Sequence, residues 1–232
     1  MMGRHHAVLG GVVFLGVAAS LGHMSPADLA ASTAACAGAA MLSDLDEPGS
    51  SVAHLCEPLS GLVSHVTAKV AGGHRKATHS LLAVGGAAAI GFAVEGSRIA
   101  SAVALAVLFA LFVRSVAPPG LRHGLVALAL AAGGAWACVS HVGTAWLVVA
   151  LPAGVALHLV GDMLTAGGVP LFWPYGRSIS WPVLGHTDSK RETLVAAGLF
   201  LAFLALCWWA FSGDLGLLHG GTAQIARGLR RF

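Results

Sequence analysis

His158 and Asp162 stand four residues apart in an apolar stretch of this 232-residue chain. On a helix, this spacing puts the imidazole and the carboxylate on the same face, one turn apart. Ionisable groups in such a stretch are costly and usually functional. Because imidazole and carboxylate both bind divalent metals, the pair predicts a metal site or a proton site at a membrane boundary.

Three acidic residues, Asp44, Asp46 and Glu47, lie within four positions at the end of another apolar run. Carboxylates are hard oxygen ligands for a divalent cation, and one of them can instead act as a general base. The alternative interpretation is a solvated loop with an Asp turn before Pro48.

His74 and His79 enclose a basic pair, Arg75 and Lys76. Histidines five residues apart do not share a helical face, but a loop histidine and a first-turn histidine can converge on one ion. The two cations suit an anionic substrate. Equally, the segment can be a basic anchor that contacts lipid headgroups.

Four further residues near the predicted helix starts receive different interpretations. His6 is a weaker candidate ligand, and the adjacent His5 is expected at the surface. Ser189 and Glu192 match a capping box that opens the last apolar run. Glu192 is therefore assigned a structural role, with ligand or base as the alternative.

The composition sets these residues in a membrane protein. The chain is 56% hydrophobic and only 10% charged, whereas soluble domains have about 25% charged residues. Its 31 glycines suit close packing of helices in lipid. A net charge of +3 is too small to indicate a nucleic-acid partner and fits the ordinary positive-inside bias.

The expected fold is all-α: a polytopic transmembrane bundle formed by residues 1–212 as one domain. An amphipathic helix on the membrane surface is expected at 52–70, within the loop 43–78, and the tail 213–232 is interpreted as an interfacial helix. About seven apolar runs predict membrane spans, and a count of six stays open; the runs are 7–21, 27–42, 79–94, 99–116, 121–139, 144–164 and 193–211.

Seven spans place the N-terminus and the loops 43–78, 117–121 and 165–192 on one side of the membrane. This side carries most of the basic residues, so the positive-inside rule predicts that it is cytoplasmic. The arginines of the tail do not follow the rule, because seven spans place the tail on the opposite side. All four groups of candidate ligands then lie at the same face. The segment 167–170 is expected beside them, as a lid or a membrane-surface segment.

Four segments resemble a known family: His6 with Gly10, then 42–48, 73–82 and 158–174. On these motifs, and on Ser189–Glu192, the chain resembles the YdjM-like bacterial inner-membrane proteins, which are regarded as metal-dependent hydrolases. The resemblance spans most of the chain and implies a multi-pass protein of the bacterial inner membrane. This family usually has proline where Ser43 stands and commonly histidine where Glu47 stands, so this site would gain an oxygen donor.

These patterns predict a membrane-embedded hydrolase that uses one or two divalent ions, zinc first, with manganese or iron as alternatives. Its candidate ligands are His6, Asp44, Asp46, His74, His79, His158 and Asp162. A bound metal would lower the pKa of a water molecule, Asp46 or Glu47 would accept its proton, and Arg75 or Lys76 would stabilise developing negative charge.

The preferred substrate is a lipid or a lipid-linked phosphoester, because the loops are expected at the level of the membrane headgroups. The alternative is a scaffold or partner-binding protein that holds a structural metal and has no catalytic activity. An ion-transport path is disfavoured, because the ionisable residues cluster at one face instead of at mid-membrane depth.

Overall fold

The computed structural model describes residues 1–116 and 125–212 and is built of helices. Three short helical turns connect the longer elements: η1 (Leu42–Asp46), η2 (Ala77–His79) and the π-helical η3 (Cys138–Val142). Within the described ranges there is no strand, and the loop after α7 makes only isolated bridges. The predicted all-α class is confirmed by eight α-helices: α1 (Gly3–Leu21), α2 (Pro26–Ala39), α3 (Leu59–Ala71), α4 (Leu81–Glu95), α5 (Arg98–Val116), α6 (Leu125–Ala137), α7 (Leu147–Met163) and α8 (Lys190–Phe211).

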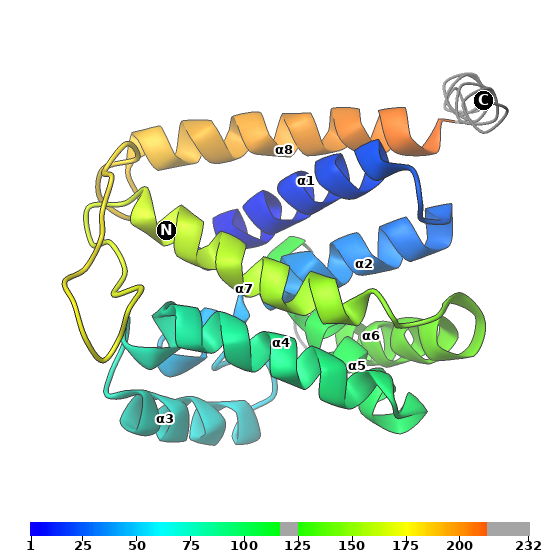
Figure 1. Ribbon diagram of the computed structural model, residues 1–232, viewed down its shortest axis with the longest axis horizontal. Coiled ribbons are helices and arrows are strands. Elements are labelled where there is room, and N and C mark those ends of the chain that lie inside the picture. The colour runs from blue at the N-terminus through cyan, green and yellow to red at the C-terminus, as the bar shows by residue number, and fades with distance from the viewer. Residues whose placement is uncertain (117–124, 213–232) are drawn as a thin grey trace, which may run out of the picture.

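Apart from α3, the helices lie side by side in one bundle (Figure 1). The helix α2 packs against α1, α5 and α7, and so lies at the centre. The pairs α4–α7 and α5–α6 form one flank, while α8 packs against α1 on the other. Most of the surface of α8 is apolar and exposed, including Leu194, Leu201 and Trp208, as expected of a helix that faces lipid.

Six apolar helices fit the predicted spans. Three of them, α1, α5 and α8, are long enough to cross a membrane, and α4, α7 and the stretch Leu128–Val142 are apolar but shorter. The remaining predicted span, 27–42, corresponds to α2, which has only 14 residues and is not among the apolar helices. The predicted turn 117–121 and the predicted tail helix 213–232 lie outside the described residues.

The glycine content serves close packing at the centre of the bundle. A Cβ atom added at Gly154 of α7 would overlap the backbone of Cys36 and the side chain of Ala39 in α2. Only glycine therefore lets these two helices approach so closely, as predicted for helices in lipid.

The amphipathic helix predicted at 52–70 is present but shorter. Residues 51–58 form turns, and α3 begins after Pro58. The helix α3 packs on η1, and its Ser64 is buried, whereas Leu62, Val66 and Val70 form an exposed apolar stripe. This stripe agrees with a helix that lies on a membrane surface, and that location stays a prediction.

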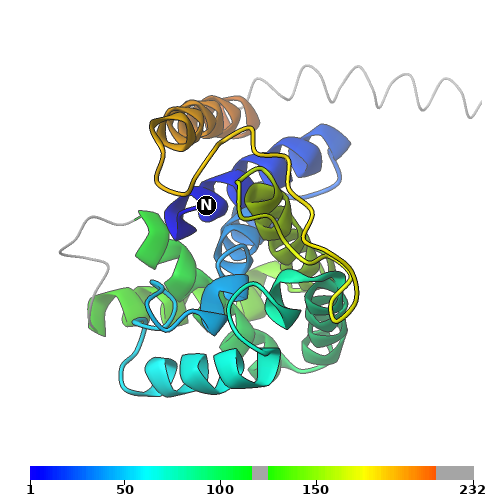
Figure 2. The same ribbon diagram turned by 90° about the vertical axis from the view of Figure 1, so that its left-hand side faces the viewer.

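Five helix ends converge at one end of the bundle, onto which Figure 2 looks. They are the start of α1, the turn η1 after α2, the turn η2 before α4, the end of α7 and the start of α8. The end of α5 lies here as well, because Arg114 Nε donates a hydrogen bond of 3.1 Å to the carbonyl oxygen of Ser51. The fold therefore brings the four predicted groups of polar residues to one end.

Candidate metal centre

The deepest group of candidate ligands consists of His6 on α1 with His158 and Asp162 on α7. Each offers one ligand atom, and these atoms lie within 4.8 Å of one another. His6 Nε2 is 3.3 Å from Asp162 Oδ1, and the imidazoles of His6 and His158 stack with centroids 3.7 Å apart. All three residues are fully buried. We call these residues the inner triad.

A second group, the outer triad, consists of Asp44 in η1, His74 in the following loop and His79 in η2. Its ligand atoms also lie within 4.8 Å of one another. Exposure increases across this triad: His79 is buried, Asp44 is half-buried and His74 reaches the surface. The outer triad therefore leads from the protein interior to solvent.

The two triads adjoin, so their residues form one centre. His158 Nε2 lies 3.1 Å from His79 Nε2 and 3.7 Å from Asp44 Oδ1. His79 Nε2 is also 3.6 Å from Asp162 Oδ2. Nitrogen and oxygen atoms from both triads thus face a common volume.

The inner histidines have the free lone pairs that a metal requires. His158 Nδ1 lies 2.7 Å from the carbonyl oxygen of Ala40, and this contact fixes the proton on Nδ1 and leaves the lone pair on Nε2. Both ring nitrogens of His6 are buried and make no hydrogen bond of good geometry among the described residues, and the carboxylate of Asp162, 3.3 Å from Nε2, is the acceptor nearby. An unpartnered buried polar group is costly, and a cation would satisfy it. The mixed nitrogen and oxygen donors therefore fit a divalent metal ion.

Asp46 belongs to neither triad and instead holds the loop that carries two of the ligands. Its carboxylate accepts hydrogen bonds from His74 Nδ1 at 2.8 Å, from the backbone nitrogen of Arg75 at 3.2 Å and from the Thr78 hydroxyl. His79 Nδ1 lies 3.4 Å away. Burial raises the pKa of Asp46, but the hydrogen bonds from His74, His79 and Thr78 outweigh it and lower the pKa below its usual range. Asp46 is therefore a charged acceptor that orients the imidazoles of His74 and His79.

The electrostatic environment differs between Asp44 and His74, the two members of the outer triad that are not fully buried. Burial raises the pKa of Asp44, although nearby His6 and His79 oppose this effect. For His74, the hydrogen bond to Asp46 raises the pKa above its ordinary value. Without a cation, the carboxyl group of Asp44 is therefore harder to ionise, and the imidazole of His74 is easier to protonate.

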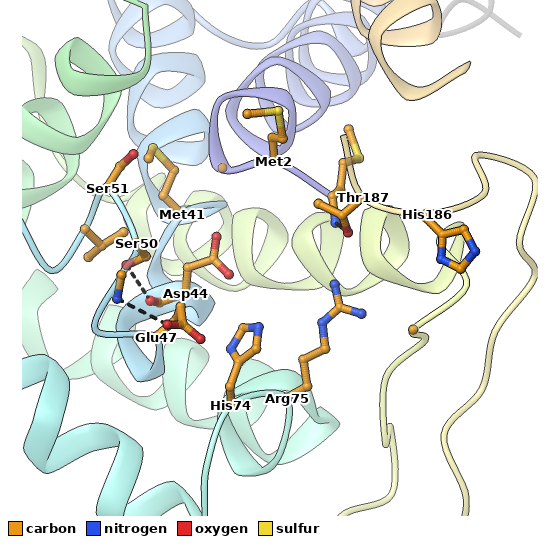
Figure 3. Close-up of a pocket in the computed structure, with 15 residues that line it drawn as sticks. Met2, Met41, Asp44, Glu47, Ser50, Ser51, His74, Arg75, His186 and Thr187 are labelled. Carbon is orange, nitrogen blue, oxygen red and sulfur yellow. Dashed lines mark hydrogen bonds between the residues drawn. The ribbon is translucent and has the colours of Figure 1, made fainter. Parts of the chain in front are cut away.

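A cavity of about 750 Å³ opens beside the outer triad and is lined by Asp44, Glu47, His74 and Arg75. Figure 3 shows His74 between the two acids and Arg75, with Arg75 extending toward Thr187. The predicted catalytic residues Glu47 and Arg75 thus share this cavity.

Arg75 connects the cavity to the inner triad. Its Nη2 lies 3.0 Å from Asp162 Oδ2, and its Nη1 donates to the carbonyl oxygen of Gly168 at 3.4 Å. The segment 167–170 is therefore beside the centre, as expected. Lys76, the alternative cation, is exposed and is not among the described residues that line the cavity.

His5 was expected at the surface, but it is buried, and its Nδ1 lies 2.6 Å from Glu192 Oε1. Ser189 Oγ accepts a hydrogen bond from the backbone nitrogen of Glu192, which confirms the predicted helix cap. The pairing of His5 with Glu192 could not be read from either motif alone. The available signal was an acid at the start of an apolar run, which requires a partner when it is buried.

The Met1 amine also contacts the centre, at 2.6 Å from Asp162 Oδ1.

The sequence model of the YdjM inner membrane protein family matches residues 1–117 and 119–215 of the chain. The chain belongs to this family. All residues of both triads lie within the matched ranges, and the resemblance seen in the motifs is confirmed. Membership in the YdjM family agrees with the several apolar helices of a multi-pass membrane protein. No curated protein and no solved structure matches the chain.

Proposed function

We propose that this YdjM-family protein is a membrane-embedded, metal-dependent hydrolase that cleaves a phosphoester in a lipid or a lipid-linked substrate. One observation carries the proposal: two adjoining His/Asp triads lie next to a cavity that also holds a guanidinium group. Metal ligands, a carboxylate and a cation around one cavity are the groups that hydrolysis of an anionic ester requires.

The two triads favour different tasks. Structural metal sites are closed, whereas catalytic sites keep one position open for water or substrate. The inner triad is shielded from solvent, because His6, His158 and Asp162 are all fully buried. The outer triad borders the cavity through Asp44 and His74, so the open position belongs on its side. A metal held there would act as a Lewis acid and lower the pKa of a bound water molecule.

Among the protein's own groups, Glu47 is better suited than Asp46 to accept a proton. Both oxygens of Asp46 already accept hydrogen bonds. Glu47 lines the cavity, and its Oε1 accepts one hydrogen bond of 3.2 Å from Gly49 N. A general base must reach the proton that it abstracts, and only a carboxylate turned to the cavity can do so.

Arg75 supports an anionic substrate. Guanidinium groups bind phosphate oxygens through paired N–H donors and stabilise the negative charge that develops during cleavage. Arg75 lines the cavity, and its salt bridge to Asp162 fixes its position relative to the inner triad. This arrangement supports a phosphoester over a neutral ester.

The location of the cavity supports a substrate at the membrane surface. It lies at the end of the bundle where loops meet, the end that also holds α3, which packs on η1, and the exposed Leu81 and Leu82 at the start of α4. Basic side chains, Arg4, Lys190 and Arg191, also lie at this end, and the positive-inside rule therefore favours the cytoplasmic side.

The experiment is a metal and activity analysis of the detergent-purified protein. We expect bound divalent metal, and hydrolysis of phosphodiester or phosphomonoester probes, or of anionic phospholipid in mixed micelles, that stops with chelator and returns with zinc or manganese. Glu47→Gln should lower turnover by about 10²–10⁴-fold while metal content is retained. Glu57→Gln is the matched control, because Glu57 is exposed, contacts His54 and does not line the cavity.

One outcome would contradict hydrolysis itself, and another would contradict the role of Glu47. Stoichiometric metal in a coordinatively closed shell, with no hydrolysis of any of these probes, would identify a structural site in a membrane scaffold. Equal activity in Glu47→Gln and Glu57→Gln would remove Glu47 from the mechanism.

A further inference from the structure

We propose that Glu192 is a positioning residue for the metal centre: it anchors the start of α1, so that His6 faces Asp162 and His158. This inference rests on the metal-binding part of the proposed function. Glu192 contacts no member of either triad directly. Its effect would therefore pass through the first turn of α1.

The contacts of Glu192 tie the start of α1 to the segment before α8. Its Oε1 accepts a hydrogen bond of 2.7 Å from the backbone nitrogen of Met2 and lies 2.6 Å from His5 Nδ1. Its Oε2 accepts a hydrogen bond of 2.8 Å from the backbone nitrogen of Asp188. Glu192 is fully buried, so these contacts are shielded from water.

The start of α1 needs such an external partner. The first backbone N–H groups of a helix have no acceptor within the helix, and Met2 at the N-cap supplies no side-chain hydrogen bond. A carboxylate near a helix N-terminus is also favoured by the helix dipole. Glu192, which comes from α8, supplies an acceptor for the N–H of the N-cap residue Met2.

Anchoring His5 fixes the direction of His6. Successive residues on an α-helix point about 100° apart, because one turn contains 3.6 residues. His5 points to Glu192 on α8, and His6 points to Asp162 on α7. A rotation of α1 that released His5 would therefore also turn His6 away from its two partners.

Little space remains for such a rotation. The ring of His6 stacks on His158 with centroids 3.7 Å apart. On another side it lies against Gly161, where an added Cβ would come within 2.9 Å of His6 Nδ1. The position of His6 is thus narrowly defined, and its placement depends on the rotation of α1 about its axis.

The test compares metal affinity in detergent, measured by competition with a chromophoric chelator. We expect Glu192→Ala to weaken zinc binding by about 10–100-fold, the range observed when a partner of a metal ligand is removed. Glu192→Gln should lose less, because the amide oxygen still accepts one hydrogen bond. Ser189→Ala is the matched control. It removes the N-cap of α8, the helix that carries Glu192, but leaves the carboxylate of Glu192 in place, so the zinc affinity should be retained.

A double-mutant cycle shows whether the effect passes through His6. In a His6→Ala background, the further change Glu192→Ala should have no effect on zinc affinity. Amide hydrogen exchange of the metal-free protein supplies an independent measurement. Residues 1–10 should exchange at least about tenfold faster in Glu192→Ala than in Ser189→Ala, because only the first variant frees the start of α1.

Three results would overturn the positioning role: unchanged zinc affinity in Glu192→Ala, an equal loss in Ser189→Ala, or the full loss repeated in the His6→Ala background. Each leaves the proposed function standing, because wild-type protein still binds metal. Wild-type protein that binds no metal overturns the proposed function, and the positioning role with it.

Discussion

The imidazole rings of His6 and His158 stack at an interplanar angle of 16°, and this contact joins the first turn of α1 to the end of α7. The stack brings a ring nitrogen from each of the two helices within 4.8 Å of the carboxylate of Asp162. The two helix ends are therefore held at the separation that a shared metal ion requires.

The first prediction concerns His158, which contacts both triads. His158→Ala should abolish stoichiometric metal binding, because the centre loses the nitrogen that lies 3.1 Å from His79 Nε2. Elemental analysis of purified protein measures the metal content. His23→Ala is the control, since His23 lies in the turn after α1, at the far end of that helix from His6. Equal metal content in both variants would exclude His158 as a ligand.

The second prediction separates an orienting carboxylate from a ligand. Asp46→Asn keeps the shape of the side chain but removes the charge that holds His74 and His79, so metal affinity should fall by about 10–100-fold without loss of stoichiometry. A competition titration measures this change. Asp28→Asn, at an exposed helix start, should leave affinity unaltered. Complete loss of metal in Asp46→Asn would show that Asp46 is itself a ligand.

The third prediction concerns pH in the metal-free protein. The pKa of His74 is raised above its ordinary value of 6.5, so its ion pair with Asp46 stabilises the fold fully below that pH and is lost as pH rises through the raised pKa. The opposite sign holds for Asp46, whose pKa is lowered: its contribution is present above its ordinary value of 3.8 and is lost in acid.

Between about pH 6 and pH 8, Tm of the metal-free protein should therefore fall, by only a few degrees because His74 is partly exposed. The variant His74→Ala should flatten this slope, and differential scanning fluorimetry measures it. Metal affinity should rise over the same range, since a metal competes with the proton on His74. A Tm that rises with pH in the wild type but not in His74→Ala would contradict the assigned pair.

The fourth prediction uses two glycines in different surroundings. A Cβ at Gly161 would meet the His6 ring, so Gly161→Ala should cost about 1–3 kcal/mol and weaken metal binding. Gly86→Ala is matched in size, but its Cβ meets nothing within 4 Å, and it should stabilise α4 by roughly 0.5–1 kcal/mol. Thermal unfolding in detergent compares the two. Equal effects would mean that the His6 ring is free to move.

The convergence of the polar groups could be predicted because it depends on topology. The runs that end at Asp44 and Asp162 and those that begin at His6 and His79 reach the same side if each span crosses once, and in the structure they meet at one end of the bundle. The start of α8 was also predictable, since Ser189 caps it. Both inferences use local signals that packing does not override.

The depth and partners of individual side chains could not be predicted. The helix α1 is apolar on nearly all sides, so periodicity does not tell which face meets another helix, and His5 was wrongly expected at the surface. The role of Asp46 depends on the donors around each oxygen atom, which come from a loop about 30 residues later. Spacing alone does not separate such an acceptor from a ligand.

The link between His5 and Glu192 has a consequence for biogenesis. Helices enter a membrane in the order of synthesis, and the carboxylate that partners the first turn of α1 arrives only with α8. Until then, the imidazole of His5 and the backbone N–H of Met2 lack their acceptor. A chain that ends before α8 therefore retains an unpaired imidazole at the start of α1, and such a group is costly to bury in lipid.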